Sequence, residues 1–395
     1  MNKNIEIIQP DDWHVHFREG DMLEMVTNFS SRINNRCVAM PNTEIPITDT
    51  NKASAYKELL NKASSNNFEP LIPCYLNENL DLEDFRKGMQ NKVFFGSKLY
   101  PSNATTNSSH GVSDISKIFK FLEILEEEKS PLLIHGEKVA DNIDIFDREK
   151  YFIDDELSII RKKFPLLKIT LEHVSTSYGV NYVKENENIA GTITPHHMLL
   201  TKKDVFHDDS INPHHFCMPV VKNETDLIEL RKAACHNNSK FFLGTDSAPH
   251  PIQEKKPDMS SKPGIFSSPC SLELYAEIFD QENAIDKLEI FCSINGAKHY
   301  SFPINDKNGR IVAFGGRDLT NKAPAKYLNS PETILFQKKN IVYNYHNAKK
   351  LLANESQLLV GEGYFDCITL SINGFRKSVA TMGTSMSAVQ IQLLW

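Results

Sequence analysis

Short apolar runs that end in polar residues recur from the N-terminus to about residue 250. Eight of these runs have the length and the Val, Ile, Leu and Phe content of buried strands. Several segments between them carry apolar residues three and four positions apart, as amphipathic helices do; these are residues 81–90, 115–129 and 154–163. The predicted strands lie within residues 5–16, 36–40, 68–76, 93–100, 131–135, 167–173, 189–195 and 240–246.

Eight alternating strand and helix units predict an α/β fold of the (β/α)₈ TIM-barrel type, in which functional side chains gather where the strands end. An open, doubly wound sheet is the competing interpretation. No Gly-x-Gly-x-x-Gly motif follows the first predicted strand, so a dinucleotide site gains no support.

The character of the sequence changes after the eighth run. Residues 271–280 and 284–300 predict two further helices, and residues 309–317 predict a short strand with a glycine turn. Residues 357–395 again alternate strand and helix patterns. We therefore predict two domains, a barrel over residues 1–305 and a small, incomplete α/β segment over residues 306–395.

Composition is that of a globular protein, with 40% hydrophobic and 24% charged residues in a chain of 395. No apolar run approaches the roughly 18 residues that span a bilayer, and the N-terminus lacks an apolar signal stretch, so we expect a cytoplasmic protein. The net charge of -7 disfavours general nucleic-acid binding. Seven widely spaced cysteines without a Cys-x-x-Cys pair argue against a disulfide framework or a Cys-rich zinc module.

Metal-competent side chains follow the predicted strands. His14 and His16 end the first strand, and residues two apart on a strand point to one face, so both could hold one ion. His135, His173 and Asp246 end three later strands. One such histidine is more often a hydrogen-bonded core residue, but five side chains at one barrel mouth predict a site for zinc or a similar ion.

Lys98 also ends a predicted strand and is expected to face this site. A lysine with its usual pKa of about 10.4 is a cation and cannot bind a metal. Reaction with CO₂ would convert it into an anionic carbamate, which could bridge two ions. The ordinary alternative is a lysine that pairs with a carboxylate.

Several long motifs resemble the monofunctional bacterial dihydroorotases of the amidohydrolase superfamily, over about residues 5–305. The motifs that carry this resemblance are Asp-Trp-His-Val-His-Phe-Arg-Glu-Gly at 12–20, Met-Pro-Asn-Thr at 40–43, Gly-Ser-Lys-Leu-Tyr-Pro at 96–101, Asn-Ala-Thr-Thr-Asn-Ser at 103–108, His-Gly-Glu at 135–137 and Asp-Ser-Ala-Pro-His at 246–250.

This resemblance implies a centre of two divalent ions, taken as zinc, that supply a hydroxide. The implied metal ligands are His14 and His16 for one ion, His135 and His173 for the other, carboxylated Lys98 between them, and Asp246 on the first ion. Asp246 would also shuttle the proton. The implied substrate-binding residues are Arg18, Asn42 and His250, with Thr105 and Thr106 on a loop that closes over the site.

The implied reaction is the reversible cyclisation of N-carbamoyl-L-aspartate to L-dihydroorotate in pyrimidine (UMP) synthesis. Arg18 suits a substrate with a free carboxylate, because its guanidinium forms a fork that lysine lacks. Another cyclic-amide hydrolase, such as a hydantoinase, is the alternative enzyme. The partner is a small-molecule substrate, and a homodimer is left open.

The chain departs from the family pattern in the loop near residue 263. The family usually has a small residue there whose backbone N–H binds the substrate carboxylate. Depending on the alignment, that position is Lys262 or Pro263, and proline has no N–H. The remaining paired histidines, His196, His197, His214 and His215, are interpreted as structural.

Residues 302–395 resemble part of a bacterial DNA primase, its catalytic core and Toprim fold. The motifs are at residues 302–317, 326–333, 359–366 and 380–385. Glu362 matches the family's acidic position, but the Asp-x-Asp that completes the Mg²⁺ site has no match. We therefore expect an inactive fragment, and a nucleic-acid-binding protein that acts through its tail is the alternative from another class.

Overall fold

A computed structural model of the protein contains two compact units, Met1–Gly309 and Arg310–Trp395. The predicted boundary between residues 305 and 306 lies outside the described residues. The structure describes residues 5–236 and 238–302 and, in the tail, residues 315–317, 327–329, 342–344, 348, 357–381, 386–387 and 390–391.

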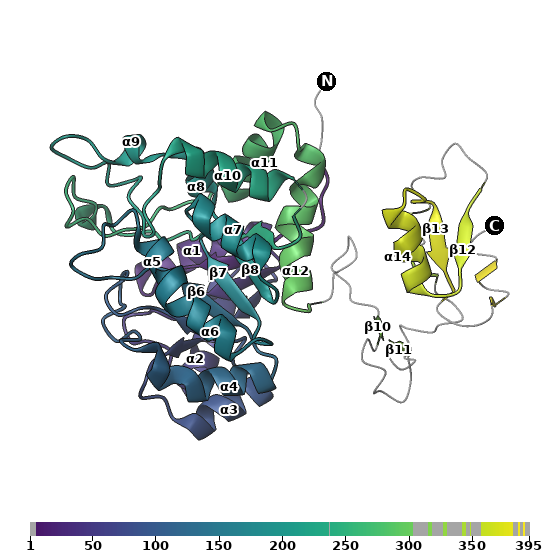
Figure 1. Ribbon diagram of the computed structural model, residues 1–395, viewed down its shortest axis with the longest axis horizontal. Helices are drawn as coiled ribbons and strands as arrows, with labels where there is room; N and C mark the ends of the chain where they lie inside the picture. Colours follow the sequence, from purple (N-terminus) through teal and green to yellow (C-terminus); the bar gives the residue numbers. More distant parts are fainter. Residues whose placement is uncertain are drawn as a thin grey trace. The chain divides into compact units, whose positions relative to one another are not determined.

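All eight predicted runs of the first unit contain strands, and these strands pair in parallel (Figure 1). The sheet orders are β1-β2-β3 and β4-β5-β6-β7-β8-β9. The third run is divided at residues 72–73, so that β3 pairs with β2 and β4 with β5. The strands are β1 Asp11–Val15, β2 Arg36–Ala39, β3 Glu69–Leu71, β4 Cys74–Leu76, β5 Ser97–Leu99, β6 Leu132–His135, β7 Ile169–Glu172, β8 Ile189–Ile193 and β9 Phe241–Leu243.

The first and last strands meet and close the barrel. Val15 forms a parallel bridge with Ser247, and the backbone N–H of Asp246 donates to the carbonyl of His14 at 2.9 Å. Asp12 adds a side-chain contact, since its carboxylate accepts from the N–H of Thr245 at 2.9 Å and from its hydroxyl at 2.6 Å. The (β/α)₈ prediction is therefore confirmed.

Helices lie outside the strands, as Figure 1 shows for α4, α6 and α7. The predicted helix at 81–90 is α3, which begins after Asp81, whose carboxylate accepts from the N–H of Asp84. The helices are α1 Asp21–Ile33, α2 Thr50–Ala63, α3 Leu82–Gln90, α4 Phe119–Glu127, α5 Arg148–Phe152, α6 Ser158–Lys163, α7 Ser177–Glu185, α8 Pro195–Leu199, α9 Lys202–Val205, α10 Glu224–Cys235, α11 Ser271–Gln281 and α12 Asn295–His299.

The helix predicted over residues 284–300 is present, and it is helical from residue 285 to residue 299 with changes of helix type along its length. It consists of a 3₁₀ turn at Ile285–Lys287, a π-helical segment at Ile290–Ile294 and α12. Gly296 in α12 packs so closely on Trp13 that a Cβ would lie 2.0 Å from the indole nitrogen. Packing against the barrel therefore shapes this segment as much as its helical periodicity does.

Two apolar clusters fill the barrel unit. The larger lies between strands and helices and includes Val15, Leu99 and Leu171. The smaller contains Trp13, Leu133 and Phe242 with Tyr300 of the C-terminal helical segment. Leu133 and His135 are two residues apart on β6 and therefore point to the same side, so this aromatic cluster lies on the inner face of the barrel, next to the site residues.

The second unit contains short paired strands and one helix in its described part. The strands β10 Gly315–Arg317 and β11 Tyr327–Asn329 are antiparallel, whereas β12 Leu359–Gly361 and β13 Ser378–Ala380 are parallel. Helix α14 Tyr364–Ile372 joins β12 to β13. Among the described helices of either unit, none is long and apolar enough to cross a bilayer.

Replacing Asp12 with Ala should destabilise the barrel by on the order of 3 kcal/mol, because the buried N–H groups of Thr245 and His14 would lose the carboxylate that accepts from them. Urea unfolding of the full chain measures this change. Asp81→Ala is the matched control, since it removes an exposed helix-capping carboxylate worth only about 1 kcal/mol. Equal losses for the two variants would show that Asp12 does not hold the closure.

Candidate metal and active site

The carboxyl ends of the strands bring the predicted site residues around one buried cavity. His14 lies on β1, His135 ends β6, and His173 and Asp246 follow β7 and β9. The cavity is lined by His14, His16, Arg18, Asn42, Tyr100, Thr105, Thr106, His135, His173, Met218, Asp246, Ala248, Pro263 and Gly264. Two predicted residues are absent from this lining: Lys98, which is fully buried, and His250, which contacts Arg18.

His14, His16 and Asp246 form the first half of the site. The Nε2 atoms of the two histidines are 3.4 Å apart. Oδ1 of Asp246 lies 3.2 Å from Nε2 of His14 and 3.1 Å from Nε2 of His16. Two imidazoles and a carboxylate that converge on one point are a ligand set for a zinc-class ion.

His135 and His173 form the second half, with ring centroids 4.7 Å apart. Nδ1 of His173 is buried and has no hydrogen-bond partner among the described residues, which costs about 1–3 kcal/mol. A bound ion would remove that cost. His14, His173 and Asp246 also offer ligand atoms within 4.8 Å of one another, so the residues present fit a divalent metal.

Lys98 forms an ion pair with Glu172, and both side chains are fully buried. Glu172, the last residue of β7, is therefore the carboxylate partner that the sequence analysis gave as the alternative to a carbamate. Burial lowers the pKa of Lys98 even though Glu172 raises it, so the neutral amine is more accessible than in a surface lysine. Glu172 also lies 3.1 Å from Nδ1 of His14.

Three site residues adopt left-handed backbone conformations that non-glycine residues rarely occupy. The φ angles are 64° at Arg18, 42° at His173 and 45° at Asp246. Each such residue costs on the order of 1 kcal/mol or more, and such strain clusters at functional sites. The chain turns sharply at these strand ends and thereby directs the side chains into the cavity.

The site distributes charge between its histidines and carboxylates. Burial alone would lower the pKa of His14, but the charges of Glu172 and Asp246 raise it to about 9. Burial lowers the pKa of His16 to about 4 despite its hydrogen bond to Asp246. Burial would raise the pKa of Asp246, yet His14 and His16 bring it well below its usual range. A metal must therefore displace the proton of His14, so acid weakens its binding.

A cluster of polar side chains beside the metal-binding residues can hold an anion. Arg18 donates from Nε to the carbonyl of Pro249 at 2.7 Å, and its Nη2 lies 2.9 Å from Nε2 of His250. Asn42 accepts from the hydroxyl of Tyr100 at 3.0 Å and donates to the carbonyl of Thr106 at 2.9 Å. These contacts fix the guanidinium and the amide at the cavity wall.

The amidohydrolase family matches residues 7–311, which is most of the chain. This chain belongs to the amidohydrolase family. The match implies a divalent metal and a small-molecule substrate, in agreement with the imidazole and carboxylate set around the cavity. The predicted amidohydrolase fold is likewise confirmed.

Curated amidohydrolases named dihydroorotase are similar over the same region. The relative from Photorhabdus laumondii is 43% identical over 305 residues, which are 76% of this chain and 87% of that protein. The relative from Buchnera aphidicola of Schizaphis graminum is 42% identical over 314 residues, 78% of this chain and 89% of that protein.

Solved amidohydrolase structures give the same result. Dihydroorotase from Saccharomyces cerevisiae in complex with 5-fluoroorotic acid is 32% identical with a TM-score of 0.71, covering 76% of this chain and 85% of that chain. Campylobacter jejuni dihydroorotase is 34% identical with a TM-score of 0.69, covering 78% and 88%. L-hydantoinase from Arthrobacter aurescens, at 16% identity and a TM-score of 0.65 over 79% and 77%, shares the fold.

A second family, the N-terminal domain of the DNA primase catalytic core, matches residues 298–349. Most of that stretch lies outside the described residues. Glu362 is described; it is exposed and follows β12. The structure therefore brings Glu362 into no cluster of acidic metal ligands among the described residues of the tail.

The loop that departs from the family pattern offers the amidohydrolase cavity no free backbone N–H. Lys262 donates its N–H to the carbonyl of Glu254 at 3.0 Å, and Gly264 donates to that of Phe216 at 2.8 Å. Pro263, between them, lines the cavity without an N–H. Residues 262–264 therefore provide the cavity with no free backbone N–H donor.

Several residues of the amidohydrolase site were missed in the sequence. Glu172 pairs with Lys98 and contacts His14, Glu137 lies 3.0 Å from His135, and Tyr100 holds Asn42. The missed signal for Glu172 was a carboxylate within a continuous apolar strand, where burial requires a partner. Met218 comes from a loop remote in sequence, and no local pattern identifies it.

Proposed function

We propose that this protein is a dihydroorotase, which reversibly cyclises N-carbamoyl-L-aspartate to L-dihydroorotate in pyrimidine synthesis. The observation that carries this proposal is one cavity that is lined both by the metal-binding histidines and by Arg18, which His250 contacts from behind the lining. The metal-binding residues serve the chemistry on the amide, and Arg18 with His250 serves binding of the carboxylate. The dihydroorotase relatives, at 42–43% identity over most of the chain, support the same reaction.

Two divalent ions, proposed to be zinc, would activate water and polarise the amide carbonyl when bound. His14 and His16 would hold one ion, and His135 and His173 the other. Lys98 would bridge them after its amine forms a C–N bond to CO₂ and loses a proton, giving a carbamate. Glu172 would lose its cationic partner and then orient His14 through Nδ1, as outer carboxylates commonly orient metal-binding histidines.

Asp246 would move the proton. Its carboxylate lies beside His14 and His16 at the cavity and can accept a proton when the ring opens and return it to the departing ring nitrogen. The reverse sequence serves ring closure. Because Asp246 is buried and excluded from bulk water, the proton stays at the reacting group.

The substrate carboxylate would bind Arg18, His250 and Asn42. The buried hydroxyl of Thr106 has no hydrogen-bond partner among the described residues and is free to bind the substrate. Thr105 lies beside it on the same loop, whose contact with Asn42 closes this side of the cavity. A loop that donates hydrogen bonds and excludes water suits an anionic substrate.

The decisive experiment compares turnover of carbamoyl aspartate or dihydroorotate with turnover of a neutral hydantoin. We expect activity on the acidic pair, and Arg18→Lys should lower kcat/KM for it by about 10-fold or more, since a bidentate charged pair is worth roughly 1.5–3 kcal/mol. Preference for the hydantoin, with Arg18→Lys unaffected, would establish the hydantoinase alternative.

Lys98→Ala should abolish turnover and lower the metal content, because no other group can bridge the ions. Short carboxylic acids should restore part of the activity by standing in for the carbamate. Metal analysis and the dihydroorotate assay on the full chain measure both effects. Normal turnover of Lys98→Ala without an added acid would refute the bridge.

Asp246→Asn should keep much of the metal but lose most of the turnover, because an amide offers an oxygen ligand and cannot accept a proton. The same two assays distinguish the roles. Thr105→Ser serves as a control that leaves the proton path intact. Full activity of Asp246→Asn would require another proton shuttle.

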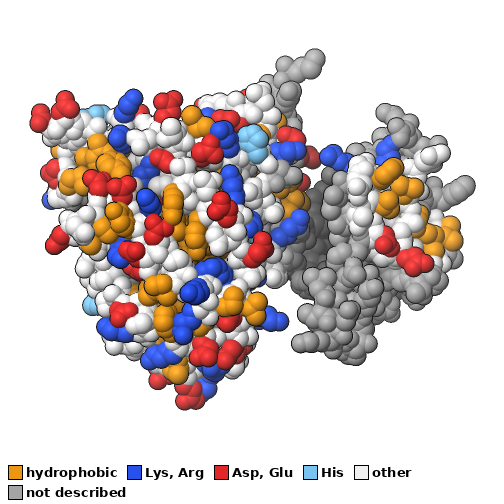
Figure 2. Space-filling view, viewed as in Figure 1, with side chains coloured by type: hydrophobic (Ala, Val, Ile, Leu, Met, Phe, Trp, Pro, Cys, Tyr) orange, Lys and Arg blue, Asp and Glu red, His pale blue; other side chains and the backbone are white. Residues whose placement is uncertain are grey.

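The tail is proposed to be a primase-derived fragment without polymerase activity. Phosphoryl transfer needs metal ions on both sides of the reacting phosphate, and carboxylates must hold these ions. The carboxylate nearest to Glu362 in sequence, that of Asp366, is used in a hydrogen bond from the backbone N–H of Gly363. Figure 2 shows acidic and basic side chains interspersed on the visible face of the barrel unit, not a continuous basic surface.

A homodimer and a cytoplasmic location are proposed as well. Light scattering tests the oligomeric state, and cell fractionation tests the location.

Deleting residues 310–395 should leave dihydroorotase activity within about twofold, since the barrel unit contains all proposed site residues. The assay compares the truncated protein and the full chain at equal metal content. Primer synthesis on single-stranded DNA by the full chain, lost in Glu362→Gln, would contradict the proposal and make the protein bifunctional.

A further inference from the structure

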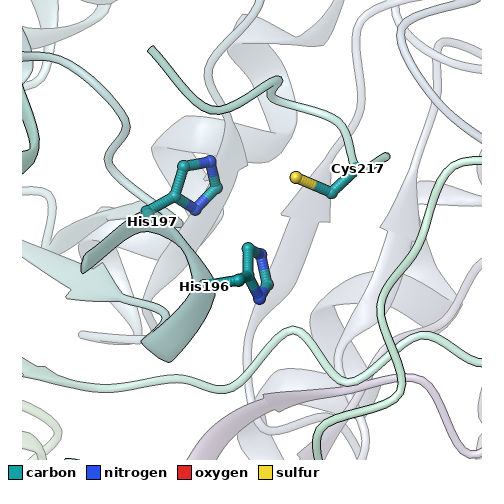
Figure 3. Close-up of side chains that lie close together, drawn as sticks. All are labelled: His196, His197 and Cys217. Atoms are coloured by element: carbon teal, nitrogen blue, oxygen red, sulfur yellow. The ribbon is translucent and has the colours of Figure 1, made fainter. Parts of the chain in front are cut away.

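A second cluster of metal-competent side chains lies in the barrel unit and shares no residue with the proposed ligands. His196 and His197 belong to the short helix α8, and Cys217 comes from a loop between α9 and α10. Each offers a ligand atom, and these atoms lie within 4.8 Å of one another. Figure 3 shows the Cys217 thiol directed toward the two imidazole rings.

His196 is the unexplained member of this cluster. Its side chain is only 4% exposed, and neither ring nitrogen has a hydrogen-bond partner among the described residues. A neutral imidazole carries one donor and one acceptor, and leaving either unpaired in the interior costs about 1–3 kcal/mol. If His196 were only a structural histidine, as the sequence suggested, no hydrogen bond from a described residue would offset this cost.

His197 and Cys217 direct their hydrogens at one atom. Nε2 of His197 lies 3.0 Å from the carbonyl oxygen of Pro219, and the Cys217 thiol donates to the same oxygen at 3.2 Å. Nδ1 of His197 lies 2.7 Å from the hydroxyl of Thr194. If the His197 proton moves to Nδ1, that hydroxyl accepts it. Nε2 and the sulfur then carry lone pairs beside the Pro219 carbonyl oxygen, which can itself serve as an oxygen ligand.

We propose that His196, His197 and Cys217 bind a zinc-class ion at a third metal site. Two neutral imidazoles and one thiolate are ligands that such ions prefer. Binding releases one proton, from the Cys217 thiol, and shifts the His197 proton from Nε2 to Nδ1. The site shares no ligand with the proposed catalytic centre and does not depend on the proposed reaction.

The electrostatic surroundings agree with neutral ligands that require proton release. Burial lowers the pKa of His196 to about 4 and that of His197 well below its usual value. Burial also raises the pKa of the Cys217 thiol; the charges of Asp246 and Glu137 act in the same direction, and the Lys222 ammonium acts against them. Lys222 also faces His197, and Asp246 and His14 face His196. Metal binding at this site therefore strengthens as pH rises, because the thiol proton must be lost.

The third site connects to the active cavity through Met218. Met218 follows Cys217 and lines the cavity, while His196 and His197 follow β8. An ion held here joins the Met218 loop to the end of β8. Its loss should therefore change KM more than kcat, because Met218 contacts the cavity and carries no chemistry.

Cobalt(II) loading of the full chain tests the site. The proposed catalytic ligands contain no sulfur, so a sulfur-to-cobalt charge-transfer band in the near ultraviolet reports on Cys217. We expect this band, together with one metal equivalent more than the catalytic centre holds. Cys217→Ser should lose both, and Cys235→Ser, which removes a buried thiol elsewhere, should keep both.

Two results would overturn the third site. One is the absence of the band at saturating cobalt, and the other is its persistence in Cys217→Ser. His196→Asn provides a second variant if Cys217→Ser does not fold: it should weaken cobalt binding at least 10-fold, and unchanged binding would exclude His196 as a ligand. These readouts do not involve turnover, so they stand apart from the dihydroorotase assay.

Discussion

The contact between the first and last strands organises the whole site. Asp12 holds Thr245 through two hydrogen bonds, and the backbones of His14 and Asp246 are joined by a third. This closure brings residues more than two hundred positions apart within ligand distance of each other. Without it, His14 and Asp246 would lie on opposite edges of an open sheet, and no metal could contact both.

The site is costly to fold. Lys98, Glu172, His14 and Asp246 place several charges in a region shielded from water, where each uncompensated charge costs several kcal/mol. Mutual pairing reduces this cost, as the Glu172 contacts with Lys98 and His14 show. Apolar residues of similar volume would stabilise the barrel more, so the charges are explained by chemistry.

The sequence predicted the strands and their polar ends well because both depend on local patterns. A buried parallel strand is a short apolar run, and His135 or Asp246 stands out where such a run stops. The partner of Lys98 could not be identified this way. Glu172 is adjacent to Lys98 only after the barrel has formed, and residue spacing does not encode that distance.

The same limit applies to His196, His197 and Cys217. Nothing in a His-His pair and a single cysteine twenty residues later indicates that they meet, since a loop of unpredictable path lies between them. The helix expected over 284–300 is present, but its 3₁₀ and π-helical parts were not predicted. Its periodicity is helical, whereas the close approach of Gly296 to Trp13 is a tertiary constraint.

The division of the third strand at residues 72–73 gives the barrel two arcs. Pro73 has no N–H to continue the ladder, so β1 to β3 form one arc and β4 to β9 the other. His14 belongs to the short arc, and Asp246 follows β9 at the end of the long one. An ion bound by both residues would cross-link the two arcs, so that they open as one unit instead of separately. Amide exchange would then slow in both arcs together when metal is added.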